Sequence, residues 1–464
     1  MNSVGASILA IVALVILFGS RRAALLAMLA GVLYVPQAQQ LEVMGFNMFS
    51  VRFLELAGFV RVVSRRELSF SKLNRIDHTL LLLYAFTAIM FCLRSSTDQA
   101  YVIGTAVDAW LCYFTFRAMV IDLEEFRWLL RMFVFLLVPY AALLLVESIS
   151  RNNLFSTIEN GLTGWERDGR LRCVGSFRHP DLLGTLGASF LALYIGLACT
   201  RTDRLRAAVG IATCLVIVWA SNSGGPACAA ATALAGWMCW KIRTHMRWVR
   251  WGIVATILSA ALLMKAPVWY LLAHVSAITG GDGYHRSYLM DISFRHLDQW
   301  WLNGLPGSDT KDWFAYSLSF GSADMTNSYL AFGLTGGLGA MGLFIFLLVR
   351  CFKSLGTALE TVRHYESESR EAQFLLWGLG VMLAVHIINW FGVTYYDQFY
   401  AIWFLQLAAI ANCSTQYLDR ERTAVDLTVS SDADGLWPET VVPTETPIND
   451  ERSPAASELS GWRT

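Results

Sequence analysis

Apolar stretches long enough to cross a lipid bilayer recur along most of this 464-residue chain. A helix needs about 20 mainly apolar residues to cross the roughly 30 Å hydrocarbon core of a membrane. The candidate runs lie at residues 4–19, 23–35, 47–63, 78–93, 101–120, 128–146, 182–199, 207–221, 227–240, 251–272, 327–349, 374–391 and 399–412. The sequence therefore predicts an all-α, polytopic membrane bundle of about thirteen transmembrane helices within residues 1–413.

The composition supports lipid as the main solvent of the chain. Hydrophobic residues make up 55% of the sequence and charged residues 16%, which is too apolar for a soluble protein of this size. The formal net charge is zero, so there is no overall basic field, and we expect no nucleic-acid partner. The nine cysteines are scattered and mostly lie inside apolar runs, so we expect no disulfide framework, no metal site and no cofactor.

Along the chain, short loops that contain Lys or Arg alternate with short loops that contain neither. Basic residues near span ends are retained in the cytoplasm. This alternation predicts an N-terminus outside the cytoplasm and a C-terminus inside it. Arg21 and Arg22 follow the first apolar run instead of preceding it, so we interpret that run as a retained span and not as a signal peptide.

Two long loops, at residues 148–181 and 266–326, then fall on the outer side. The second is rich in aromatic residues and glycine, which predicts a packed, partly helical cap. Residues 414–464 are rich in Ser, Thr, Asp, Glu and Pro and offer little apolar surface, so we expect a disordered cytoplasmic tail.

The first candidate site gathers Arg170, Arg172, Arg178 and His179 just before a predicted span. Arginine suits a diphosphate because its planar fork donates two parallel hydrogen bonds and keeps its proton. The alternative is contact with lipid headgroups, or ion pairs within the same loop, whose carboxylates are Glu159, Glu166 and Asp168.

The second candidate lies in the other outer loop, where Arg286 would form a second phosphate clamp. His285 or His296 would supply the titratable group, since histidine is the usual acid or base near neutral pH. The alternative is that Arg286 pairs with Asp282, four residues earlier on the same helix.

The third candidate is Thr326, Asn327 and Tyr329 at the outer start of a span, with an N-cap as the alternative role. The glycines that follow are expected to be close-packing positions between helices, and they are Gly333, Gly336, Gly337 and Gly339. A short turn is a sufficient explanation for residues 222–226.

Four polar residues, Arg52, Asp108, His386 and Asn389, lie in or near apolar runs, where such groups are costly. Function is the default hypothesis for them, although Arg52 and Asp108 would also suit each other as an ion pair. For His386 we favour a structural role.

The motifs between about residues 170 and 350 resemble the O-antigen ligase and Wzy-type polymerase superfamily of bacterial envelope glycan assembly. The N-terminal third resembles it in hydropathy alone. The residues that carry the resemblance are Arg172, Gly175, His179, Pro180, Gly184, the Ser223-Gly224-Gly225 turn, Arg286, Gly304, Gly307 and Asn327 to Leu330.

The resemblance implies a GT-C-like fold in the bacterial inner membrane, with a periplasmic N-terminus. It implies transfer of a glycan from undecaprenyl diphosphate to an acceptor hydroxyl, without a nucleotide-sugar or metal, with Arg172 and Arg286 holding the diphosphate. Ligases of this superfamily have histidine before the asparagine of the last motif, where this chain has Thr326. We therefore expect a polymerase of exopolysaccharide or O-antigen repeat units, with His179, His285 and His296 as candidate bases.

Other functions remain as alternatives. A ligase or protein oligosaccharyltransferase of the same superfamily differs in its acceptor only. A transporter of lipid-linked glycans would typically show two equivalent halves and interrupted helices, and the sequence predicts neither. Membrane lipid and a co-polymerase or export protein are the expected partners.

Overall fold

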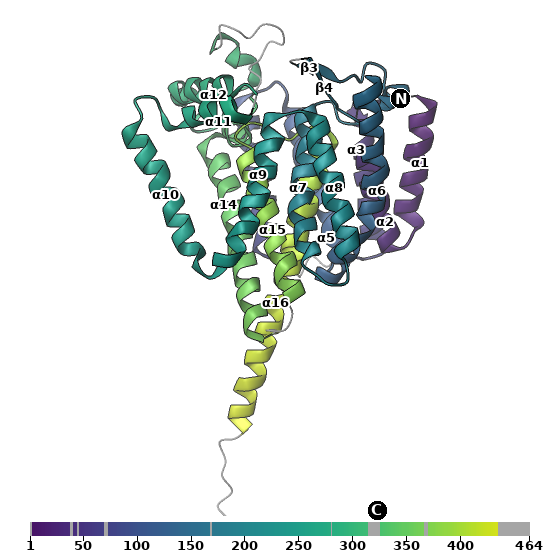
Figure 1. Cartoon of the computed structure of the whole chain (residues 1–464), viewed down its shortest axis with the longest axis vertical. Helices are drawn as coiled ribbons and strands as arrows, with labels where there is room; N and C mark the ends of the chain where they lie inside the picture. The colour runs from purple at the N-terminus through teal and green to yellow at the C-terminus, as the bar shows by residue number, and fades with distance from the viewer. Residues whose placement is uncertain are drawn as a thin grey trace, which may run out of the picture. The chain divides into compact units, whose positions relative to one another are not determined.

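The computed structural model describes residues 2–37, 40–43, 46–68, 73–167, 169–279, 281–313, 325–365 and 370–434, and they are mainly helical (Figure 1). The α-helices are α1 (Ser3–Phe18), α2 (Arg21–Tyr34), α3 (Ser50–Ser64), α4 (Arg75–Arg94), α5 (Gln99–Met119), α6 (Leu123–Ser150), α7 (Pro180–Ala198), α8 (Arg204–Ser221), α9 (Gly224–Met238), α10 (Met246–Leu263), α11 (Leu271–Thr279), α12 (Gly283–Arg295), α13 (Leu297–Trp300), α14 (Ser328–Tyr365), α15 (Arg370–Asn389) and α16 (Tyr400–Asp434).

Among the described residues, seven helical segments are long and apolar enough to cross a membrane. They are α4, α6, α7, α8, α14, α15 and the continuous run Gly224–Leu263, which contains α9, η3 (Cys239–His245) and α10. A helical chain suited to a membrane is therefore confirmed. Each of the other apolar runs also overlaps a helix, but α1 and α2 have only 16 and 14 residues, shorter than the hydrocarbon core requires. The number thirteen stays a prediction.

Helix α7 is the most enclosed of these segments, with 89% of its apolar window buried. It packs along α8, α9 and α15 (Figure 1). His179 precedes its first residue and caps it, and Asp181 lies in its first turn. The start of α7 is therefore held at a fixed place within unit 1 of the chain, residues Met1–Asp419.

Helix α14 is interrupted, which the sequence reading did not predict. Gly336 and Gly337 have non-helical backbone angles, and the loop after α13 inserts at this break. The Leu338 N–H donates to the Trp301 carbonyl (2.8 Å), replacing a hydrogen bond that the helix loses. Gly337 has φ +74°, and a Cβ there would lie 2.2 Å from the Leu302 carbonyl oxygen. Glycine is required because two backbones meet, and the expectation of an uninterrupted span is wrong.

The described part of residues 266–326, the segment expected to be the second outer loop, is a packed helical cap, as predicted. It contains η4 (Val268–Tyr270), α11, α12, α13 and η5 (Gly307–Trp313). Leu289, Trp300 and Trp313 form a small apolar core with Leu330 of α14. Residues 314–324 of this loop, with the aromatic Tyr316, lie outside the described residues.

Two antiparallel hairpins depart from the all-α prediction: β1 (Gln40–Val43) with β2 (Phe46–Phe49), and β3 (Trp165–Arg167) with β4 (Arg170–Arg172). The second hairpin ends at Arg172, within residues 148–181, the segment expected to be the first outer loop, which also contains η2 (Leu154–Thr157). Two strands of three residues give too weak an alternation to be read from sequence.

Helix α16 continues to Asp434, so the expected disordered tail does not begin at residue 414. A helix that is already nucleated by packing extends at little cost through good helix formers, and the sequence provides Glu421, Arg422 and Ala424. The prediction for residues 435–464 lies outside the described residues. Residues Arg420–Thr464 form a second unit.

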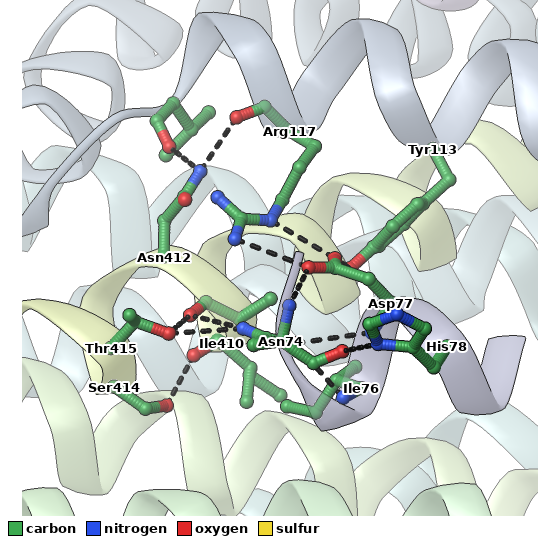
Figure 2. A network of polar contacts seen from close by, with 12 residues as sticks. Asn74, Ile76, Asp77, His78, Tyr113, Arg117, Ile410, Asn412, Ser414 and Thr415 are labelled. Atoms are coloured by element: carbon green, nitrogen blue, oxygen red, sulfur yellow. Dashed lines mark hydrogen bonds and ion pairs between the residues drawn. The ribbon is translucent and has the colours of Figure 1, made fainter. Parts of the chain in front are cut away.

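A buried polar network joins α4, α5 and α16 (Figure 2). Arg117 Nε donates to Asp77 (3.0 Å), and Tyr113 donates to the same carboxylate. Asn74 caps α4 and also donates to a backbone carbonyl of α16 (3.1 Å). Asn412 of α16 returns a hydrogen bond to the Arg117 carbonyl (2.7 Å). Because each of these hydrogen bonds joins two different helices, the network fixes how the three helices meet.

We predict that Arg117→Ala lowers the free energy of unfolding by about 3–5 kcal/mol, because the fully buried Asp77 carboxylate loses its positive counter-charge and keeps only neutral hydrogen-bond donors. The measurement is the unfolding transition of the purified protein in detergent. Arg295→Ala is the matched control, since its i,i+4 pair with Asp291 is 71% exposed at the arginine and should matter little. Equal losses in both variants would contradict the account.

Candidate functional site

The segment 172–179, which we call the arginine loop, is anchored to the helices around it. Glu147 of α6 accepts hydrogen bonds from the backbone N–H groups of Val174 and Gly175, both at 3.0 Å. Asn153 donates to the Gly175 carbonyl (2.7 Å). Gly175 has φ +57°, and a Cβ there would collide with the Tyr140 hydroxyl, so glycine is needed at this turn.

Further backbone contacts hold the arginine loop from three other sides. The Cys173 N–H donates to the Ala220 carbonyl at the end of α8 (3.0 Å). The Ser176 hydroxyl donates to the Leu33 carbonyl of α2 (2.5 Å), and Gln398 donates to the Ser176 carbonyl (2.8 Å). Buried loop backbone is thus paired, as a rigid support for side chains requires.

Two arginines from distant segments converge on one carboxylate. Arg172 Nη2 donates to Asp181 Oδ1 (2.8 Å), and Arg286 Nη2 of α12 donates to Asp181 Oδ2 (3.1 Å). Both Arg172 and Asp181 are 6% exposed. The alternative pairing of Arg286 with Asp282 is wrong, because the Asp282 side chain caps the His285 N–H (2.9 Å).

The turn between α8 and α9 supplies a hydroxyl to this cluster. Arg172 Nη2 also donates to Ser223 Oγ (2.5 Å), and that hydroxyl donates onward to the Ser221 carbonyl (3.0 Å). Ser223 therefore acts as an acceptor for Arg172. The short-turn explanation of residues 222–226 was incomplete, because the turn also places a functional side chain.

The C-terminal end of α15 and the residues after it lie beside Arg286, where Gly392 leaves room for the guanidinium and Asn389 adds a side-chain amide. A Cβ at Gly392 would lie 2.6 Å from Arg286 Nη1, so a larger residue would displace the guanidinium. Asn389 donates to Thr185 Oγ1 of α7 (2.8 Å) and, like Arg286, lies next to Gly225. The sequence marked Asn389 as a costly polar group in a span, but nothing in the sequence joined it to Arg286.

The cluster carries more positive than negative charge. Burial lowers the pKa of Arg172, the Asp181 carboxylate opposes this change, and the charges of Arg167 and Arg286 lower the pKa further. The Arg172 Nε is enclosed and donates to no acceptor among the described residues. Arg172 and Arg286 can therefore accept an anion with several oxygens, close to the positive N-terminal end of α7.

The other two predicted arginines lie differently. Arg178 makes a two-point ion pair with Asp397, with Nε donating at 2.8 Å, and Asp397 is 6% exposed with φ +52°. This pair ties the arginine loop to the segment before α16. Arg170 is exposed on β4. Of the alternative loop pairings, Glu166 pairs with Arg151, and Asp168 lies outside the described residues.

Of the three candidate histidines, His179 lies at the cluster. Its Nδ1 accepts a hydrogen bond from the Asp181 N–H (3.1 Å) and lies 3.9 Å from Asp181 Oδ2, while its ring meets Trp165 edge-on. His285 is exposed on the cap. His296 bonds the Ile292 carbonyl (3.0 Å) and stacks on Trp313, which are structural contacts within the cap.

The third candidate group has visible structural roles. Asn327 caps α14 by accepting from the Leu330 N–H (3.1 Å), which confirms the N-cap alternative. Tyr329 donates to the Ile387 carbonyl (3.0 Å). Thr326 Oγ1 is enclosed and has no hydrogen-bond partner in the described part of the chain.

The polar groups predicted within spans also find partners. Arg52 and Asp108 form a two-point ion pair, with the shortest contact at 2.8 Å, so the mutual pairing is confirmed. His386 is fully buried, bonds the Tyr395 hydroxyl (2.5 Å) and is surrounded by aromatic rings. These contacts agree with a structural role.

A cavity of about 590 Å³ lies between α4, α5, α14 and the segment 390–403. Its aromatic lining includes Tyr84, Tyr101, Trp390 and Trp403. Its threonine hydroxyls donate to backbone carbonyls, so they offer few donors to an occupant; they are Thr87, Thr105, Thr310, Thr335 and Thr394. The cavity is therefore suited to an apolar guest.

No protein-family model matches this sequence, and no curated protein matches it significantly. The chemistry of the site must therefore be argued from its own residues. Two guanidiniums beside a helix N-terminus form an arrangement that fits a phosphate or diphosphate.

We predict that Asp181→Asn lowers the melting temperature in anion-free buffer and enlarges the stabilisation by inorganic pyrophosphate. Removing the carboxylate leaves Arg172 and Arg286 without their shared counter-charge, so a bound anion stabilises the folded protein more in the variant than in the parent. The measurement is thermal unfolding of the detergent-solubilised protein with and without pyrophosphate. Asp397→Asn, which removes the partner of Arg178, is the control and should leave the pyrophosphate effect near that of the parent. The same pyrophosphate effect in the parent and in Asp181→Asn would be evidence against an anion site here.

Proposed function

We propose that this chain is an inner-membrane glycosyltransferase of the Wzy type, with about thirteen spans and a GT-C-like architecture. It would polymerise undecaprenyl-diphosphate-linked oligosaccharide units of an exopolysaccharide or O-antigen on the outer face of the membrane. The convergence of Arg172 and Arg286 on the buried Asp181 is the observation that carries the proposal. An enclosed site with excess positive charge is what a leaving diphosphate needs.

In the proposed reaction, the bond between the anomeric carbon and the diphosphate oxygen breaks, and the acceptor hydroxyl oxygen bonds to that carbon. The electron pair of the broken bond leaves with the diphosphate, whose growing charge Arg172 and Arg286 would stabilise. Preorganised charge of this kind is usually the largest catalytic contribution. The acceptor proton needs a base, and His179 is favoured among the three candidates by its place beside Asp181.

The diphosphate would take over the position of the Asp181 carboxylate between the two guanidiniums. Asp181 is therefore a positioning residue, which holds both arginines ready while the site is empty. Trp390 and Thr394 line the apolar cavity, whereas Asn389 and Gly392 of the same segment lie at Arg286. This adjacency supports the cavity as the place for the carrier's hydrocarbon chain.

Thr326 supports polymerase over ligase, because threonine cannot act as a general base at neutral pH. A ligase or protein oligosaccharyltransferase remains the nearest alternative, with the same donor. The interrupted helix α14 favours a transporter of lipid-linked glycans as the alternative from another class. A co-polymerase or export protein would be the partner of a polymerase.

The experiment is to delete the gene, complement it with the parent, Arg172→Ala or Arg286→Ala, and size the cell-surface and secreted polysaccharide. We expect both variants to lose most high-mass polymer, with single lipid-linked repeat units left over. Loss of one oxyanion-stabilising group typically costs about 100-fold or more in rate. Arg295→Ala is the control, because Arg295 is exposed and lies at the opposite end of α12 from Arg286.

Membrane levels of each variant are compared first, so that a folding defect is not mistaken for a catalytic one. Intact polymer retained on its lipid carrier would replace the polymerase by a ligase. Repeat units trapped on the cytoplasmic side would favour the transporter. Unchanged polysaccharide in all strains would refute the glycan-assembly proposal.

A further inference from the structure

Arg243 and Arg363 lie at the end of the bundle opposite to Asp181, where the charge of one acts on the other. Helix α9 begins next to Ser223 and runs away from the arginine loop into η3, which carries Arg243. Helix α14 begins at Ser328, bonded to the Trp390 carbonyl, and ends in a turn that carries Arg363. The two residues therefore lie at the far ends of helices that start near the candidate site.

Aromatic packing holds Arg243 in place. Its Nη1 donates to the Trp240 carbonyl (3.1 Å), and its guanidinium carbon lies 4.2 Å from the centre of the Trp240 ring. Trp240 in turn packs on Phe374 of α15, with ring centres 4.7 Å apart. The guanidinium is thus presented at a fixed position between η3 and α15.

Both arginines are half-buried, and neither makes an ion pair with a carboxylate in the described part of the chain. The Nε atoms of Arg243 and Arg363 are shielded from solvent and donate to no acceptor among the described residues. The charge of Arg243 acts unfavourably on that of Arg363, and Glu360, which makes no ion pair with either arginine in the described residues, acts in the opposite direction. By contrast, Arg127 at the same end of the bundle is paired with both Asp203 and Glu371.

Enclosed like charges with unused donors are unfavourable unless an anion joins them. A phosphate group matches them because its oxygens accept from two guanidinium forks at once. Further basic residues flank Arg243 in the sequence, together with tryptophans typical of a membrane interface; they are Lys241, Arg247, Arg250, Trp248 and Trp251. Basic pockets between membrane helices commonly bind anionic lipid headgroups.

We propose that Arg243 and Arg363, with Trp240 as a stacking platform, form a phosphate-binding site at the end of the bundle predicted to face the cytoplasm. The phosphate belongs to the headgroup of an anionic phospholipid, and a soluble phosphate is the other source of the same chemistry. The site does not depend on the proposed glycosyltransferase activity, because it uses none of that site's residues. Occupation would fasten η3 to the end of α14.

The test measures binding of dioctanoyl phosphatidylglycerol to the purified full-length protein by native mass spectrometry, with dioctanoyl phosphatidylcholine and inorganic phosphate in parallel. Arg243→Gln with Arg363→Gln should weaken phosphatidylglycerol binding by about tenfold or more. The control pair is Arg247→Gln with Arg250→Gln, which removes the same charge at exposed positions on α10. It should change phosphatidylglycerol binding by less than about threefold. Arg243→Lys with Arg363→Lys should give an intermediate loss, because it keeps the charge and loses the forks.

Equal losses in the two glutamine pairs would overturn the proposal, since the binding would then be diffuse attraction to a basic surface. Undiminished binding in the Arg243→Gln, Arg363→Gln variant would overturn it as well. Saturable binding of inorganic phosphate without a preference for phosphatidylglycerol would reject the lipid source. A variant with Glu366→Gln and Glu368→Gln is also measured, because these two glutamates lie outside the described residues. If phosphatidylglycerol binds this variant and not the parent, the glutamates are the counter-charge of Arg243 and Arg363, and a phosphate site is refuted.

Discussion

The carboxylate of Asp181 determines the geometry of the candidate site, because it is the only group that touches both Arg172 and Arg286 in the described residues. One arginine arrives on a hairpin strand and the other on a cap helix, so the carboxylate also joins the cap to the membrane core. A buried ion pair of this kind is weak as a source of stability but strong as a determinant of position. It leaves the cluster with a positive excess that an anionic substrate can use.

The rest of the fold supports that position. Glu147, Ser176 and Gln398 pin the backbone of the arginine loop to α6, α2 and the start of α16. The enclosed helix α7 holds Asp181 in its first turn. At the break in α14, the loop after α13 is locked by paired backbone groups, which steadies the cap that carries Arg286. Rigid support on all sides is the condition for electrostatic preorganisation.

Hydropathy was enough to predict a mainly helical chain suited to a membrane, because a membrane imposes one length and one kind of surface on every span. Charge and side-chain chemistry indicated four candidate arginines, Arg170, Arg172, Arg178 and Arg286, and the family resemblance singled out Arg172 and Arg286 among them. The sequence could not show that Asp181 bridges them, or that Ser223 and Asn389 join the cluster, because those contacts depend on how four helices meet. The break at Gly337 was equally hidden, since packing glycines and helix-breaking glycines look alike until the partner backbone is known.

The most direct test of the account is a cryo-electron microscopy map of the full-length protein in lipid nanodiscs with a polyprenyl diphosphate added. The account predicts density for the two phosphates between the guanidiniums of Arg172 and Arg286, with the Asp181 carboxylate withdrawn from at least one of them. Diphosphate density elsewhere, with Asp181 still bonded to both arginines, would contradict the account.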